Sequence, residues 1–505
     1  MNALAWLPVA LVAAALGGCA APGRIGEHLE SPSAEVRECA QWYRALDEEI
    51  EAAGVRDAQY SRVRGFPYLR IDRLHASLKE RARASPALLD VYAGRLLEMD
   101  VESRRHEIEN LPVSRLEALQ EKGAPPGRSA ALRRTAECGQ LLRKIDLARP
   151  DARGDLLAGA SVPDDYSDAS RAIGLYPLTR VFFVHGVRRW EAEVLAGFKE
   201  TMRAAPEASL VRYAPPAVPP LPRVAVAGIL GRAELDPLGV PVLSARELSR
   251  LAATYAPSFE VEIAGDYDRF GALRWRRGAT IPEVEAAEPA VYLNAAYTRY
   301  GERVLLQLVY TLWFPERPPQ DDADLLAGRL DGLVWRVTLA PDGEPLIYDS
   351  IHPCGCYHQF FPTPRARLRP APDPLEEWAF VPQELPPVGE DEHPVVSLAS
   401  RTHYIRQVSL ARAGDSLARY VFHAYDELRS LPSIDGGSRS VFGPDGIIAG
   451  SERPERLLFW PMGIASAGAM RQWGRHATAF SGRRHFDDAE LFERRFELEL
   501  ASRPR

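Results

Sequence analysis

Apolar residues in the first third of the chain recur every three or four positions, the spacing of one face of an α-helix. The clearest stripe follows a Ser33 N-cap and consists of Val36, Cys39, Tyr43, Leu46 and Ile50. A second stripe begins at Pro86, a residue favoured in the first helical turn, and a third contains Cys138, Leu142 and Ile145. The pattern predicts a helical domain over 19–150, built as a small bundle.

A mixed region is predicted over 151–222. Its helix carries apolar residues four positions apart, namely Trp190, Val194, Phe198 and Met202. The stretch 214–222 contains five prolines in nine residues, which excludes a helix or a central strand and predicts a stiff, extended linker. Ser244 and Glu247, three positions apart, predict a capping box at the start of the next helix.

The periodicity becomes alternating in the second half of the chain. Residues 291–314 predict two strands joined near Gly301, and 334–351 predict two strands joined at Asp342-Gly343, a strong hairpin signal. Further strands are predicted at 395–400, 404–410, 418–425 and 456–460. We therefore expect a mainly antiparallel β domain with helical additions over 223–505, and an α+β fold class for the whole chain.

The N-terminus carries an uncharged apolar run from Ala3 to Gly17, too short to cross a bilayer as a helix and typical of a secretory signal. It ends in Leu16-Gly17-Gly18-Cys19, which resembles the lipobox of bacterial lipoproteins. The resemblance implies that residues 1–18 are a signal peptide that is removed and that Cys19 is lipidated. Ala20, in place of Asp, implies an outer-membrane protein that faces the periplasm and contacts the membrane through its lipid.

Net charge and compartment bear on which partners the protein can bind and on whether its cysteines form disulfides. A net charge of −7 and a pI near 6.0 argue against nucleic-acid binding, which normally requires a basic balance. An oxidising periplasm permits disulfides. Because Cys39 and Cys138 both lie on apolar stripes of one predicted bundle, we predict a disulfide between them.

The candidate site is the segment His352-Pro353-Cys354-Gly355-Cys356-Tyr357-His358. Its two histidines and two cysteines fall at every second position, so they would share one face of an extended strand. This donor set suits zinc or copper, provided that the proline and glycine bend the segment enough for the four side chains to surround one ion. A disulfide or exchange pair between the two cysteines, and simple buried packing, are the alternatives.

Other histidines in the second half could add ligands or acid–base groups; they are His403, His423, His476 and His485. The acidic stretch 315–331 lacks the spacing of a calcium loop and is interpreted as a solvated loop. No nucleophile elbow, Walker loop or His-Glu-x-x-His helix is present. The sequence therefore supports two hypotheses: an envelope lipoprotein with a binding or structural role, its protein or small-molecule partner unidentified, or a periplasmic metal-dependent enzyme, for instance a hydrolase, centred on 352–358.

Overall fold

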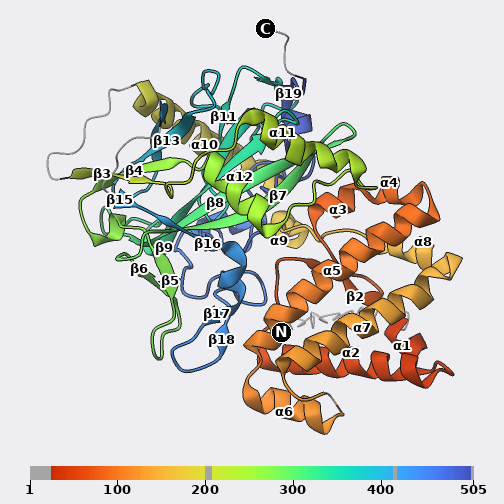
Figure 1. Ribbon diagram of the computed structural model, residues 1–505. Coiled ribbons are helices and arrows are strands. Elements are labelled where there is room, and N and C mark those ends of the chain that lie inside the picture. Colours follow the sequence, from red (N-terminus) through yellow and green to blue (C-terminus); the bar gives the residue numbers. More distant parts are fainter. Residues whose placement is uncertain (1–23, 124, 200–207, 413–417, 502–505) are drawn as a thin grey trace, which may run out of the picture.

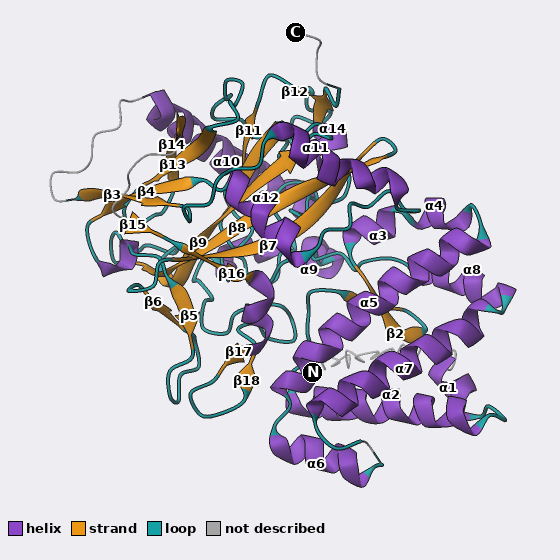
Figure 2. Cartoon of the chain, in the orientation of Figure 1, coloured by secondary structure: helices purple, strands orange, loops and turns teal. Residues whose placement is uncertain are grey.

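The computed structural model describes residues 24–123, 125–199, 208–412 and 418–501, so Cys19 and Met202 lie outside the described residues. Helices dominate the N-terminal part and sheets the C-terminal part, as Figures 1 and 2 show. The predicted α+β fold class is confirmed.

The N-terminal layer is helical. Ser33 and Ser85 cap two of its three long helices, α2 and α5, each accepting a hydrogen bond from the backbone N–H three residues on. A short hairpin that the periodicity did not predict lies between them, because strands of three and six residues are too short to show alternation. The elements are α1 (Arg24–Leu29), α2 (Ala34–Ala53), β1 (Ser61–Val63), β2 (Phe66–Ile71), α3 (Arg73–Ser77), α4 (Lys79–Arg83), α5 (Pro86–Asn110), α6 (Val113–Glu121), α7 (Arg128–Leu147) and α8 (Pro150–Gly159).

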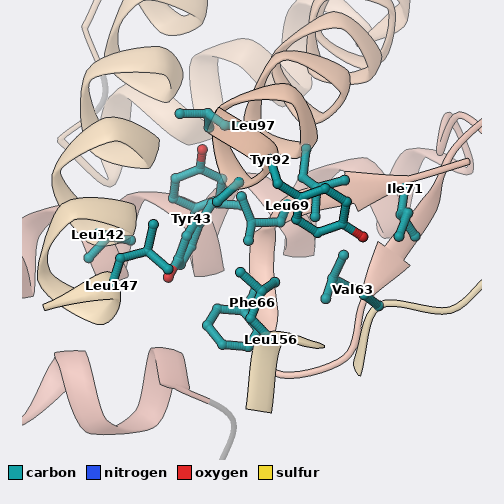
Figure 3. Close-up of a cluster of buried hydrophobic side chains, with 14 of the residues drawn as sticks. Tyr43, Val63, Phe66, Leu69, Ile71, Tyr92, Leu97, Leu142, Leu147 and Leu156 are labelled. Atoms are coloured by element: carbon teal, nitrogen blue, oxygen red, sulfur yellow. The ribbon is translucent and has the colours of Figure 1, made fainter. Parts of the chain in front are cut away.

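The core of this layer packs the helices against the hairpin. Tyr43 from α2, Phe66 and Leu69 from β2, and Leu142 from α7 are all fully or almost fully buried and lie together in Figure 3. The predicted disulfide is present: Cys39 of α2 and Cys138 of α7 are bonded, with their Cα atoms 5.0 Å apart. It joins two helices that already share a buried face.

The middle of the chain follows the predicted order. No helix or strand occupies the proline-rich stretch between Ala214 and Arg223, and the Ser244–Glu247 capping box forms as expected. The elements are α9 (Asp168–Ile173), α10 (Tyr176–Lys199), β3 (Ser209–Ala214), α11 (Arg223–Gly231), η1 (Arg232–Leu235) and α12 (Ala245–Tyr255).

A six-stranded sheet forms the centre of the molecule. Its strand order is β11-β10-β9-β8-β7-β16, antiparallel except for the parallel β16–β7 pair. Both predicted hairpins, β7–β8 and β9–β10, are present, and the second turns at Asp342-Gly343. The strands are β7 (Ala290–Tyr300), β8 (Arg303–Arg317), β9 (Gly328–Leu339), β10 (Pro345–Ile351), β11 (Gln359–Pro362) and β16 (Val421–Ala424).

A second, five-stranded sheet has the order β14-β13-β4-β3-β15, with parallel pairs at β13–β4 and β15–β3. The expected strands near 395–400 and 404–410 are β13 and β14. The added strands are β4 (Ser258–Ile263), β13 (Glu392–Leu398), β14 (Ile405–Arg412) and β15 (Ala418–Arg419).

The remaining elements are short and surround the two sheets. The prediction of a strand at 456–460 is wrong, because residues 456–459 form helix α13. Leu457 and Leu458 are exposed there and have no neighbouring strand to pair with. These elements are η2 (Asp266–Asp268), β5 (Ala272–Arg274), β6 (Glu283–Glu285), β12 (Ala366–Leu368), η3 (Tyr425–Ser430), β17 (Leu431–Pro432), β18 (Ser438–Arg439), α13 (Arg456–Phe459), η4 (Trp460–Met462), α14 (Leu491–Arg495) and β19 (Phe496–Leu498).

Buried ion pairs join the helical layer to the sheet region. Arg429 of η3 is fully buried and donates to Asp57 at 2.8 Å and to Glu102 of α5. Arg73 pairs with Asp487 near the C-terminus at 3.1 Å. A buried charge that loses its partner destabilises strongly, so these pairs fix how the two parts meet.

We expect reduction of the Cys39–Cys138 disulfide, or its removal in Cys39→Ser/Cys138→Ser, to lower the free energy of unfolding by about 4 to 5 kcal/mol, because it closes a loop of 99 residues. Denaturant unfolding of the oxidised protein and the double variant measures the difference. Alkylation of the denatured, unreduced protein should leave these two cysteines unlabelled and label Cys354 and Cys356. Labelling of all four would contradict the assignment.

Candidate apolar binding cavity

A cavity of about 510 Å³ lies between helix α10 and the segment 352–358. Aromatic side chains make much of its wall: Trp190 of α10 lies 5.3 Å from Tyr357 and 5.5 Å from Phe380, measured between ring centroids. Phe183 of α10 packs 5.2 Å from Phe459. Large, mostly apolar, concave sites with few polar groups are typical of small-molecule binding sites.

The segment 352–358 leaves strand β10 and bends sharply at the cavity wall. The N–H of Gly355 donates to the carbonyl of His352 at 2.8 Å, and the N–H of His352 donates to the carbonyl of Cys356 at 3.0 Å. Gly355 has φ +90°, and a Cβ there would lie 2.4 Å from the carbonyl oxygen of Ala477. The expected bend is therefore present, and its close backbone contact requires glycine.

The two histidines of the predicted metal set contact different carboxylates. His352 Nδ1 lies 3.2 Å from Asp331, whereas His358 Nε2 lies 2.9 Å from a different carboxylate, Asp349. Within the described ranges, these residues do not appear in any group of three or more ligand atoms lying within 4.8 Å of one another. The two histidines are thus bound by separate buried acids, and the zinc or copper centre at His352, Cys354, Cys356 and His358 stays a prediction.

The two cysteines line the cavity as free thiols, so the disulfide alternative is not what the structure shows either. The N–H of Cys356 donates to the sulfur of Cys354 at 3.3 Å. A separate side-chain hydrogen bond with the Cys354 thiol, together with burial, raises the pKa of Cys356 well above its ordinary value. Cys356 is therefore a neutral thiol near pH 7, and it contributes a soft, weakly polar patch to the wall.

His403 does meet the 352–358 segment, as the sequence suggested. It lies in the turn between β13 and β14, and its Nδ1 is 2.7 Å from Asp331, the same carboxylate that binds His352. Burial opposes the charge of Asp331, but the two histidines outweigh it and hold the pKa of Asp331 well below its usual range. The solvated-loop interpretation is wrong for Asp331, which is buried within β9.

The other three histidines lie elsewhere. His423 is between Glu288 and Glu427, and His485 is beside Asp164 and Asp165. His476 is buried against Phe486 and Trp473, and burial lowers its pKa to about 4. None of the three lines the cavity.

The cavity contains polar groups that the sequence analysis missed. Burial raises the pKa of Glu377 and of Glu455 to about 7, and neither lies in a recognisable motif. His358 lines the cavity with its Nδ1 buried and without a hydrogen-bond partner among the described residues. Burial lowers its pKa to about 3, so the ring is neutral, and with Nε2 donating to Asp349 its Nδ1 is an acceptor for a ligand.

Backbone strain gathers around the same region. In the described part of the chain, the non-glycine residues with positive φ are Leu175, Leu330, Tyr357, Arg401, His403 and Ser466. Tyr357 lines the cavity, Ser466 precedes the lining residue Ala467, and Leu330 precedes Asp331. Strained residues cluster at binding and catalytic sites because the surrounding structure holds them there.

A separate group, Glu102, His106 and Asp426, could hold a metal ion by its spacing. Both carboxylates of this group already have a cationic partner, because Arg429 forms ion pairs with Glu102 and with Asp426. Burial, Arg429 and Arg105 lower the pKa of His106 to about 3. We interpret this group as part of the buried interface between the helical layer and η3.

No protein-family model, curated protein or solved structure gives a significant match to the chain. Across the helices of the described residues, none is both long and apolar enough to span a membrane. Functional inference therefore depends on the site itself.

Glu455 supplies a pH test of the cavity. Burial raises its pKa above the ordinary value of 4.5 to about 7, despite Arg453 and Arg317 and with Asp324 and Asp331 adding to the rise. The protonated carboxyl therefore stabilises the folded state. This contribution to the free energy of unfolding is complete below pH 4.5 and is lost as the pH rises through 7, which lowers the free energy of unfolding by roughly 3 kcal/mol. Relative to the natural protein, Glu455→Gln should therefore gain stability between pH 5 and pH 9.

Urea unfolding at the two pH values measures this difference. The exposed Glu384 is the matched control, since Glu384→Gln should change the free energy of unfolding little at either pH. An equal effect of Glu455→Gln at pH 5 and pH 9 would show that this carboxyl is not held in an apolar environment.

Proposed function

We propose that this protein is a lipid-anchored envelope lipoprotein that binds an apolar small molecule in the cavity beside α10. The observation that carries the proposal is the 510 Å³ cavity itself, walled by aromatic side chains and holding only a few polar groups. Such a site binds through burial of apolar surface, which contributes about 25 cal/mol per Å². The polar groups then select the ligand's orientation.

The polar groups define what the ligand must offer. Trp190 Nε1 is a buried donor without a hydrogen-bond partner among the described residues. His358 Nδ1 is a buried acceptor that likewise has no hydrogen-bond partner among them. A ligand with an apolar body, an acceptor for Trp190 and a donor for His358 would satisfy both. A metal-dependent enzyme centred on 352–358 is not proposed, because the donor atoms of that segment do not converge.

Gly186 allows the cavity to be filled without disturbing packing. It lies on α10 and lines the cavity, and a Cβ there would meet no atom within 4 Å. Gly186→Phe should weaken binding of a neutral apolar dye such as N-phenyl-1-naphthylamine by roughly tenfold or more, because the new ring occupies the site. Dye fluorescence in a titration measures the affinity.

Gly197 is the matched control. It lies on the same helix, its Cβ position is equally open, and it does not line the cavity. Gly197→Phe should bind the dye like the natural protein. Saturable binding that both variants retain would place the dye elsewhere, and absence of saturable binding to the natural protein would refute the proposed function.

The anchor is tested separately. If Cys19 is lipidated, as its lipobox implies, the protein should incorporate labelled palmitate and sediment with the outer membrane. Cys19→Ala should abolish the label and release the protein from that fraction. A Cys19→Ala protein that still fractionates fully with the outer membrane would contradict lipid anchoring.

A further inference from the structure

Exposed apolar side chains are carried by elements that contact one another, α9, α10, α13 and η4. Ile173 of α9, Leu178 and Phe182 of α10, and Leu457, Leu458 and Trp460 near α13 are between 43% and 79% exposed. We call these six residues the apolar face. Large contiguous apolar patches are rare on soluble surfaces and mark sites of interaction.

The parts of the apolar face lie side by side. Helices α9 and α10 both pack against η4, which directly follows α13. The contact is close: a Cβ on Gly174 would lie 2.5 Å from Pro461. Phe182 and Leu458 belong both to the apolar face and to the cavity lining, so the cavity is bordered by exposed apolar side chains.

The segments that carry the apolar face are basic in an acidic chain. Residues 169–190 contain four arginines and no Asp or Glu, and residues 456–486 contain five arginines and no Asp or Glu, although the net charge of the protein is −7. Three of these nine arginines are buried, namely Arg171, Arg471 and Arg484, and four pair with carboxylates, namely Arg180, Arg189, Arg475 and Arg483. Arg188 and Arg456 are exposed and have no carboxylate partner within the described residues. Apolar side chains flanked by arginines are the composition of a surface that lies on an anionic bilayer.

We propose that the apolar face docks onto an anionic lipid bilayer with the cavity mouth toward the lipid. Phe182, Leu458 and Trp460 enter the headgroup region, and Arg188 and Arg456 contact lipid phosphates. A bilayer accounts for both features, because it takes up apolar side chains and attracts positive charge. If the cavity binds an apolar ligand, as proposed above, docking lets that ligand pass between the bilayer and the cavity without crossing water.

Hydrogen exchange of the full chain on vesicles tests docking. One set of vesicles contains phosphatidylcholine only and the other phosphatidylcholine with phosphatidylglycerol, so any N-terminal lipid anchors the protein equally to both. We expect amide exchange in 173–189 and 456–463 to slow by roughly tenfold on the anionic vesicles relative to the neutral ones. Phe182→Asp should abolish that protection.

Val224 of α11 is the matched control, because it is 80% exposed, against 79% for Phe182, and lies outside the apolar face. Val224→Asp should keep the protection. Equal exchange on both kinds of vesicle, or protection that appears without vesicles as protein concentration rises, would overturn the proposal; the second result would indicate pairing of two copies. Dye binding to the cavity is measured without vesicles, so failure of docking and failure of the proposed function are distinguishable.

Discussion

One buried carboxylate fixes the wall of the cavity. Asp331, within strand β9, binds His352 at the end of β10 at 3.2 Å and His403 in the β13–β14 turn at 2.7 Å. Strand β9 belongs to the six-stranded sheet and the turn to the five-stranded sheet, so this single group connects the two. Arg453 approaches the same carboxylate at 3.6 Å. An ionised, buried acid is tolerated only when its partners remain in place, and the segments that supply them are therefore held rigidly.

The contacts of Asp331 affect the cavity because His352, one of its partners, begins the bent segment 352–358. His352 is held by Asp331, Gly355 is pressed against the backbone at Ala477, and Tyr357, two residues later, adopts a strained positive φ. His358 is held from its other side by Asp349, which Arg336 binds at 2.6 Å. Residues so constrained keep their positions before a ligand arrives, which reduces the ordering entropy that binding costs. The free thiols and the neutral imidazole suit recognition of an apolar body better than charge-dependent chemistry.

Local features of the fold could be predicted from the sequence. The Ser33 cap, the capping box at Ser244 and the Asp342-Gly343 hairpin each depend on a few neighbouring residues, and all are present. The disulfide between Cys39 and Cys138 followed from two apolar stripes that had to face one core. The bend at Gly355 was expected from a proline and a glycine in the segment, although the four donor side chains that the bend was argued to bring together do not converge.

The composition of the site could not be predicted in the same way. Asp331 and His403 are 72 residues apart and meet because of how the two sheets lie against each other, which no local pattern contains. Helix α10 was predicted as a helix, but its role as a cavity wall depends on what packs opposite it. The strand expected at 456–460 failed because short apolar runs do not distinguish a strand from an exposed helical turn.

The most direct test of the account is a crystal structure with a brominated apolar probe, located by anomalous scattering from bromine. The account predicts a single strong peak in the cavity, bordered by Trp190 of α10 and by the Cys356-Tyr357 segment. A peak only at other surfaces, or a cavity closed by its own side chains, would contradict the claim that this cavity is the binding site.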